Sequence, residues 1–304
     1  MKDLDELKEK IQREADRSAA WVADNKMVCA GDKTKLLILG TKQLKNVKHC
    51  ETGIVNIDVC ETEVADSKSE KLLGLVVSND LSWKQYLYGE KWRQEKKENF
   101  PGLIPQLSQR VGMLSKLVKM VPKARFKMLS EGIFKSKMLY CLQVFGNVWG
   151  QGFDEVERRN VGFGKEDLRK LQVLQNKVCR MKTMLSRQTS TKKLLESSKE
   201  LSVHQLVAYT TLVTVHKIKM NKKPTYLDNR LKMRPLEQDT IEPRRQVNKI
   251  EVRQNLTLSR AGFIYRGSLL WNQTSEAMRV NLNTVMYKKE ARKWVELNVS
   301  IKPD

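Results

Sequence analysis

The sequence lacks the long apolar stretch of a membrane span and the paired cysteines of a disulfide framework. No apolar run approaches the length of about 18 residues that crosses a bilayer. The start MKDLDELKEK lacks the apolar stretch of a signal peptide. The five cysteines have no C-x-x-C spacing, and the three histidines add no zinc-ligand spacing to them. We therefore expect a soluble intracellular protein, nuclear or cytoplasmic, with reduced thiols, no membrane partner and no structural metal.

The motifs of common catalytic sites are also missing. The chain has no adjacent Asp-Asp pair and no G-x-S-x-G, H-E-x-x-H or G-x-x-x-x-G-K-[ST]. Residues 30–34, AGDKT, match only the end of a P-loop. His204 and His216 are 12 residues apart in a predicted helix, which places them on different faces at about 100° per residue. These absences disfavour nucleotide hydrolysis and a histidine dyad.

What the sequence does have is an uneven positive charge. Lys plus Arg number 57 against 35 Asp plus Glu, a net charge of +22. Residues 1–100 hold 18 basic and 18 acidic residues, so residues 101–304 hold 39 basic against 17 acidic and carry the whole excess. Basic residues on amphipathic helices favour a polyanionic partner, and nucleic acid is favoured over a membrane surface. The alternative is a basic surface that is merely soluble.

Periodicity predicts an α+β fold that is predominantly helical. Apolar residues at steps of three and four predict a helix over 3–24. Runs rich in β-branched residues at Leu36–Leu39, Ile54–Val59 and Leu72–Val77 predict a small antiparallel sheet packed on that helix.

Beyond residue 100 the pattern predicts a basic helical bundle. One helical stripe consists of Leu103, Leu107, Val111, Leu114, Val118 and Val121. Further helices are expected over 123–145, 168–185 and 202–220, with a loop at 146–164 and a basic extended arm at 222–253. The tail carries the aromatic residues Phe263, Tyr265, Trp271, Tyr287 and Trp294 and ends in a basic helix. These aromatics suit stacking on bases, but core packing is the favoured interpretation.

Several segments occur in an order that is typical of one family. They are WVADNK at 21–26, CAGDKTKLLILG at 29–40, KLLGLVV at 71–77, LSW at 81–83, LSQRVGML at 107–114, YC at 140–141, VWG at 148–150, LQVLQN at 171–176 and FIYRGSLLWN at 263–272. In this order the chain resembles the C-terminal part of the reverse transcriptases of jockey-like non-long-terminal-repeat retrotransposons. The resemblance implies four regions: a palm-edge and primer-grip-like subdomain at 1–99, a thumb-like basic helical region at 100–221, a basic linker at 222–260 and an aromatic and basic segment at 261–304.

The resemblance also implies nucleic-acid contacts. Lys33 and Lys35 match the palm motif whose lysine lies near the incoming nucleotide, and Leu73 and Gly74 match the hairpin at the primer end. The expected phosphate contacts in the thumb are Arg110, Lys116, Lys119, Lys123, Arg125 and Lys127. The partner implied is RNA or DNA, for example a primer–template duplex.

The family's palm strand with its Tyr-x-Asp-Asp would lie before residue 1, and this sequence does not hold it. Two-metal phosphoryl transfer needs paired carboxylates, whereas Asp58 and Asp80 sit singly at predicted strand ends. We therefore expect a truncated reverse transcriptase-like protein with no catalytic residues and no cofactor, Mg²⁺ being needed only if a polymerase site went unrecognised. The alternatives are a mobile-element relic, a helical protein-interaction scaffold, or a polymerase completed in trans by a separate palm chain.

Overall fold

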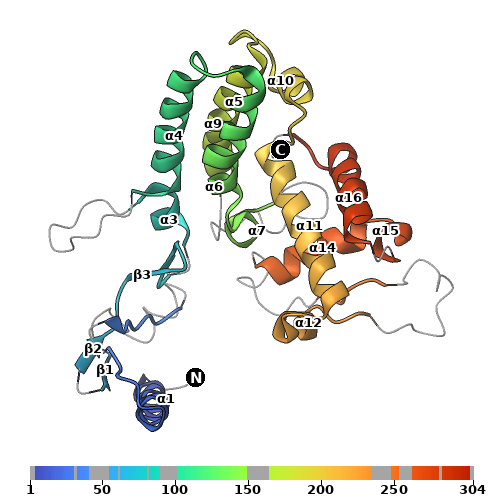
Figure 1. Ribbon diagram of the computed structural model, residues 1–304. Helices are drawn as coiled ribbons and strands as arrows, with labels where there is room; N and C mark the ends of the chain where they lie inside the picture. Colours follow the sequence, from blue (N-terminus) through green and yellow to red (C-terminus); the bar gives the residue numbers. More distant parts are fainter. Residues whose placement is uncertain are drawn as a thin grey trace, which may run out of the picture. The chain divides into compact units, whose positions relative to one another are not determined.

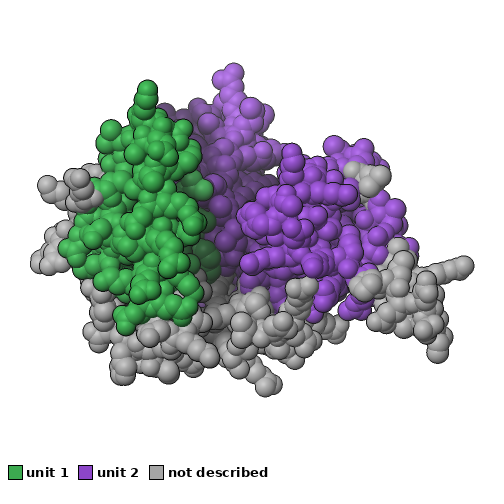
Figure 2. All heavy atoms as spheres, turned by 90° about the horizontal axis from the view of Figure 1, so that it is seen from below, with its two compact units in different colours: residues 1–102 green, residues 103–304 purple. Residues whose placement is uncertain are grey.

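The computed structural model describes the greater part of the chain. The described residues are 4–30, 33–40, 55–60, 62–80, 82–89, 101–148, 164–234, 248–252, 262–280 and 283–301. The chain divides into two compact units, unit 1 (residues 1–102) and unit 2 (residues 103–304), shown in green and purple in Figure 2. Helices dominate, and the strands form two antiparallel hairpins. The expected α+β, predominantly helical fold is confirmed.

Unit 1 begins with the predicted helix. Helix α1 (Leu4–Asp24) has Asp5 and Glu6 in its first turn, where negative charge favours the helix dipole. The helix ends at Asp24, and Lys26 two residues later has a left-handed backbone (φ 54°) that cannot continue it. Ile11 and Ala15 pack from α1 onto the small core of the unit.

Two hairpins follow α1 in unit 1. Strand β1 (Asn56–Val59) pairs antiparallel with β2 (Thr62–Ala65), and β3 (Ser69–Leu72) pairs with β4 (Leu75–Ser78). The core cluster contains Leu36, Val55, Ile57, Val59 and Val64. The Gln12 amide fixes α1 to β1, because it donates to the carbonyl of Asp58 and accepts from the Asp58 N–H, each at 2.8 Å.

The strand predictions need correction. The run at Ile54–Val59 is confirmed as β1 over its described part, but the run at Leu36–Leu39 contains only an isolated bridge from Leu36 to Asp66. The run at Leu72–Val77 holds a hairpin turn at Leu73 and Gly74, which have φ values of 48° and 84°. The prediction failed because the residues around this turn are apolar and therefore resemble one continuous strand. Strand β2 and the short helix α3 (Lys84–Tyr88) were not predicted.

Unit 2 opens with a helical segment that the sequence predicts only in part. Helix α4 (Leu103–Leu117) is followed by α5 (Lys123–Ser130), the π-helical turn η2 (Glu131–Lys135), α6 (Ser136–Leu139) and α7 (Leu142–Phe145). The single helix expected over 123–145 is therefore wrong. A π turn follows Ser130, and Cys141 adopts a left-handed conformation at φ 56°. These two irregularities redirect the chain while Phe134, Met138 and Phe145 stay buried.

The remaining described helices of unit 2 follow α7, and several of them pack on α11. They are α9 (Lys165–Thr183), α10 (Thr191–Ser198), α11 (Val203–Asn221), α12 (Thr225–Arg230), α14 (Phe263–Gln273), α15 (Glu276–Val280) and α16 (Thr284–Asn298). Helix α11 contacts α7, α9, α14 and α16 (Figure 1). Gly267 permits the close approach of α14, because a Cβ there would lie 2.8 Å from Cγ2 of Val215.

The sequence predicted α9 and α11 but missed other parts of unit 2. Helix α10 has only two buried apolar residues and gave no signal. The arm expected at 222–253 contains α12 and an isolated bridge between Met233 and Ile250, so an extended conformation throughout was wrong. Residues 235–247 and 253–260, and residues 149–163 of the expected loop, lie outside the described part.

Candidate nucleic-acid interface

Exposed cations outnumber exposed acids across unit 2. Among its described residues, 22 lysines and arginines are exposed against six aspartates and glutamates. The imbalance is sharpest at residues 101–130, which contain six basic residues and no acidic residue. Of the five exposed cations in this segment, only Lys127 has an acidic residue within one helical turn in sequence, Glu131.

The burial pattern of α4 determines which of its cations reach solvent. Leu103, Leu107, Val111 and Leu114 form its buried stripe. Lys116 lies off the stripe and is exposed, as is Lys119 in the turn that follows the helix. The apolar periodicity that drives the helix into the core therefore also orients these two lysines outward.

Helix α5 continues the cationic surface. Pro122 is its N-cap, a position where the missing N–H costs no intrahelical hydrogen bond. Phe126 is 1% exposed and anchors the helix. Lys123, Arg125 and Lys127 lie beside Phe126 in sequence and are all exposed. We call Lys116, Lys119, Lys123, Arg125 and Lys127 the α4–α5 surface.

Apolar side chains are interspersed with these cations. Met113, Met120 and Met128 are 55%, 77% and 73% exposed. They are flexible side chains without a flat ring, so they offer adaptable apolar contact rather than a platform for a stacked base.

Arg110 has a different role from the one expected. Its guanidinium is half-buried and donates a hydrogen bond to the carbonyl of Ile133 in η2. This bond joins α4 to the π turn. The structure therefore places Arg110 in a helix–helix contact, and we do not include it in the α4–α5 surface.

The other expected contact residues belong to unit 1. Lys33 and Lys35 are exposed in the segment before Leu36. Leu73, 84% exposed, and Gly74 form the tip of the β3–β4 hairpin. These four residues belong to unit 1, whereas the α4–α5 surface belongs to unit 2.

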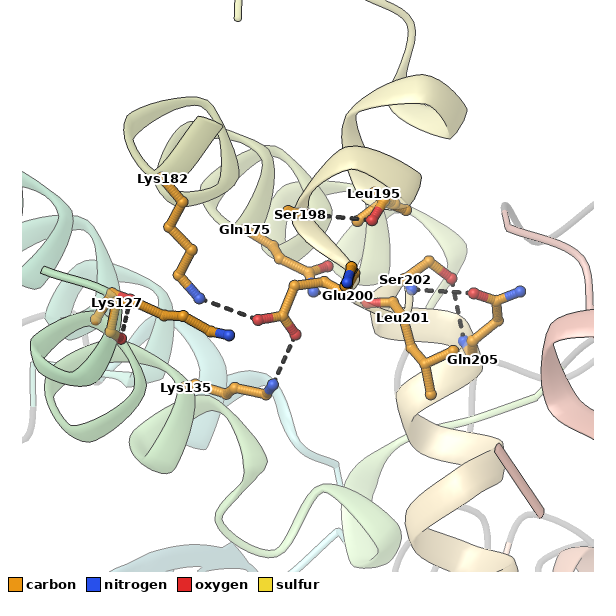
Figure 3. A network of polar contacts seen from close by, with 12 residues as sticks. Lys127, Lys135, Gln175, Lys182, Leu195, Ser198, Glu200, Leu201, Ser202 and Gln205 are labelled. Carbon is orange, nitrogen blue, oxygen red and sulfur yellow. Dashed lines mark hydrogen bonds and ion pairs between the residues drawn. The ribbon is translucent and has the colours of Figure 1, made fainter. Parts of the chain in front are cut away.

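A buried carboxylate stands close to the α4–α5 surface. Oε1 of Glu200 lies 3.0 Å from Nζ of Lys182 in α9, and Oε2 lies 2.6 Å from Nζ of Lys135 in η2. Figure 3 shows these two ion pairs and the side chain of Lys127 directed toward the same carboxylate. Burial works to raise the pKa of Glu200, but the hydrogen bonds and charges of Lys135 and Lys182 outweigh it and lower the pKa. Sequence reasoning missed this network, because Lys135 and Lys182 lie 65 and 18 residues from Glu200 in the sequence.

Two of the five tail aromatics lie in the core, and Phe263, Tyr265 and Trp294 are half-buried. Trp271 and Tyr287 are fully buried, and the ring of His216 stacks on Tyr287 with centroids 3.9 Å apart. The expectation of core packing is confirmed for these two residues. His216 and His204 are both buried in α11.

The structure groups no metal ligands in its described part. No set of three His, Cys, Asp or Glu residues among the described positions could hold an ion. Asp58 is exposed in β1. Asp80 accepts hydrogen bonds from the Ser78 hydroxyl at 2.7 Å and the Ser82 N–H at 3.0 Å, which fixes the turn after β4.

Comparison of the chain with protein-family models, with curated proteins and with solved structures found no match. Among the described helices, none is both long and apolar enough to span a membrane.

Proposed function

We propose that unit 2 binds nucleic acid through the α4–α5 surface, in a chain derived from the C-terminal part of a jockey-like reverse transcriptase. The observation that carries the binding proposal is the cluster of five exposed cations in a segment without acidic residues. The derivation rests on the order of the sequence motifs. The proposal assigns no catalytic residue.

Phosphate recognition requires cations that are exposed and not already paired within the protein. In helix α1 of unit 1, by contrast, Lys10 and Arg17 pair with Glu6 and Glu14 at 2.6 and 2.9 Å. No acid lies within one helical turn of Lys116, Lys119, Lys123 or Arg125 in sequence. A phosphate backbone would supply the counter-charge, and release of its condensed cations would drive association.

The preferred ligand is a duplex rather than a single strand. Single-strand binders add aromatic platforms on which bases stack. In unit 2 the rings of Trp271 and Tyr287 are buried and the exposed rings of Tyr140 and Tyr226 belong to other segments, while the α4–α5 surface exposes lysine, arginine and methionine. Such a surface suits a regular array of phosphates and reads no base edges.

The test is binding to a labelled duplex across a salt series, measured by fluorescence anisotropy. We expect the logarithm of affinity to fall linearly with the logarithm of salt concentration. The triple variant Lys123→Gln, Arg125→Gln, Lys127→Gln should bind more weakly, and its salt slope should be smaller by about 0.9 for each lost phosphate contact, up to about 2.7.

The matched control removes the same charge elsewhere in unit 2. Lys288, Lys289 and Lys293 are exposed on α16. Changing all three to Gln should leave the salt slope near that of the original protein. Equal effects of the two triple variants would show a diffuse charge effect, and absence of binding at low salt by a folded protein would refute the proposal and favour the scaffold or relic.

Primer extension on an RNA template with Mg²⁺, in the same preparation, separates binding from polymerisation. We expect duplex binding without extension. Extension that survives repurification would contradict a binding-only role, and Asp58 and Asp80 would then be the first carboxylates to replace.

A further inference from the structure

A second group of exposed cations lies where α9 meets α10. We call it the α9–α10 surface, and its four residues are Lys177, Arg187, Lys192 and Lys193. Among the residues that the structure describes, none of these four side chains takes part in an ion pair. Arg169 and Lys182 of α9, by contrast, are paired with Glu166 and Glu200 and do not belong to this surface.

Two hydrogen bonds hold the segments of the α9–α10 surface together. Nδ2 of Asn176 in α9 donates to Oγ1 of Thr191, the first residue of α10, at 3.1 Å. Nη2 of Arg180, one turn further along α9, donates to the carbonyl of Arg187 at 3.4 Å. Asn176 and Thr191 each directly precede a lysine of the surface. These contacts therefore gather cations from α9, from the connection and from α10 in one part of the fold.

The lysines of α10 occupy positions that disfavour positive charge. Lys192 and Lys193 lie in the first turn of α10, which contains no acidic residue. The amino end of a helix dipole is positive, so cations there destabilise the helix. Glu196, one turn later, is exposed, and no ion pair joins it to either lysine in the described part of the chain. Departures from local rules of this kind are expected where residues serve function.

The α9–α10 surface and the α4–α5 surface lie near the same end of unit 2. Figure 1 shows the turn from α4 to α5 and the connection from α9 to α10 at that end. Helix α9 also contacts both α4 and α5. A nucleic-acid duplex carries one negative charge for about every 1.7 Å of its axis, so it presents phosphates without interruption. One duplex can therefore contact both surfaces.

We propose that the α9–α10 surface is a second contact for the duplex that the α4–α5 surface binds. The inference rests on the proposed function of unit 2. The ligand of the second contact is the phosphate backbone, because the surface offers only lysine and arginine as charged groups and no aromatic ring on which a base stacks. The phosphates supply the negative charge that Lys192 and Lys193 lack within the protein.

The test is fluorescence anisotropy of the full chain with a duplex of about 20 base pairs, or two helical turns, across a salt series. The variant Arg187→Gln, Lys192→Gln, Lys193→Gln should bind more weakly, with a salt slope smaller by about 0.9 for each lost phosphate contact, up to about 2.7. Combined with the α5 triple variant, the two reductions in slope should add. Arg187→Lys, Lys192→Arg, Lys193→Arg keeps the charge and should keep most of the slope.

The variant that loses charge should fold at least as well as the original protein, because it removes two cations from the positive end of α10. Thermal unfolding checks this, so weaker binding can be separated from loss of structure. The matched control is the α16 triple variant, which removes the same charge from another part of unit 2 and should leave the slope unchanged.

The outcomes distinguish the second contact from the proposed function itself. An unchanged slope in the α9–α10 variant, beside a reduced slope in the α5 variant, would overturn the second contact and leave the proposed function standing. Equal reductions in all three triple variants would show diffuse charge and overturn it too. Energy transfer between separately labelled duplexes at limiting protein would show two duplexes on one protein and overturn a shared duplex. Absence of any binding by the folded protein would refute both proposals.

Discussion

Unit 2 buries an extensive apolar core beneath a cationic surface, whereas unit 1 buries a small cluster and carries charges of both signs in balance. In unit 2 most of α11 is buried, and Trp271, Tyr287 and Leu270 are fully enclosed. In unit 1 the hairpins are two-stranded and the core cluster consists of five buried residues. Because apolar burial is the main source of stability, we expect unit 2 to have the larger free energy of unfolding.

The two units also differ in how they neutralise their exposed cations. Helix α1 offsets its cations with acids one turn away, and such exposed pairs contribute little to stability. Unit 2 leaves Lys123 and Arg125 of α5 without an acidic residue within one helical turn in sequence. This arrangement is expected when a partner supplies the missing negative charge.

The largest predicted effect tests whether the two units unfold independently. Trp271 is fully buried and its Nε1–H donates to the carbonyl of Asn248 at 2.8 Å. Trp271→Ala should lower the free energy of unfolding of unit 2 by about 3–5 kcal/mol. Hydrogen-exchange mass spectrometry should show faster exchange in α11, α14 and α16, and unchanged exchange in α1 and β1.

The control for Trp271→Ala is Leu297→Ala on α16, since Leu297 is 85% exposed and should leave exchange unchanged. Equal acceleration of exchange in α1 and α11 would contradict independent units and would show a single cooperative structure.

The second predicted effect concerns the ion pairs of Glu200 and depends on pH. The Glu200 side chain is 7% exposed, and Lys182 and Lys135 are 10% and 27% exposed. Glu200→Gln should lower the free energy of unfolding by about 2–3 kcal/mol at neutral pH, because two lysines lose a charged acceptor.

The pKa of Glu200 is lowered in the folded state, so the folded protein keeps this carboxylate ionised more readily than the unfolded chain does. The stabilisation is therefore fully present above the unfolded pKa of about 4.5 and is lost as the pH falls through the lower folded pKa. Urea unfolding at several pH values measures this. Glu196→Gln, on the exposed side of α10, should show little effect at any pH, and a Glu200→Gln difference that does not shrink in acid would refute the assignment.

The sequence predicts features of this fold that depend on local periodicity. The predicted stripe repeats every three or four residues from Leu103 to Val121. The structure buries Leu103, Leu107, Val111 and Leu114, but α4 ends at Leu117 and leaves Val118 and Val121 half-buried beyond it. The same reasoning located α1, α9 and α11. These helices were predictable because the spacing of their apolar residues alone determines which face is buried.

Features that depend on distant contacts were not predictable. The π turn at Glu131–Lys135 and the left-handed Cys141 interrupt a segment that is apolar throughout its second half. Arg110 looks like any other surface cation until the carbonyl of Ile133 approaches it. No local pattern distinguishes these positions from regular helix.

The candidate sites show the same limit. The α4–α5 surface was predictable from its charge, apart from Arg110. The α9–α10 surface was not, because its cations come from α9, from the connection that follows and from α10, and Asn176 and Arg180 hold these segments together. Exposed cations beside a buried stripe were the available signal, and their grouping could be identified only in the fold.

The smallest predicted effect concerns the tip of the β3–β4 hairpin in unit 1. Leu73 has φ 48° and is 84% exposed, so it adopts a left-handed conformation without burying its side chain. Two-residue turns with positive φ at both positions prefer Asn-Gly. Leu73→Asn should therefore stabilise unit 1 by about 0.5–1 kcal/mol, seen as slower hydrogen exchange in β3 and β4.

Gly74→Ala is the opposing control, since φ at Gly74 is 84° and a Cβ there adds strain. Faster exchange in Leu73→Asn would contradict a strained turn. The same variant tests the expected contact of Leu73 with a primer end. If the leucine side chain contacts a primer terminus, Leu73→Asn should weaken binding to a primer–template but not to a blunt duplex, despite the gain in stability. Unchanged binding to both would confine nucleic-acid recognition to the cations of unit 2.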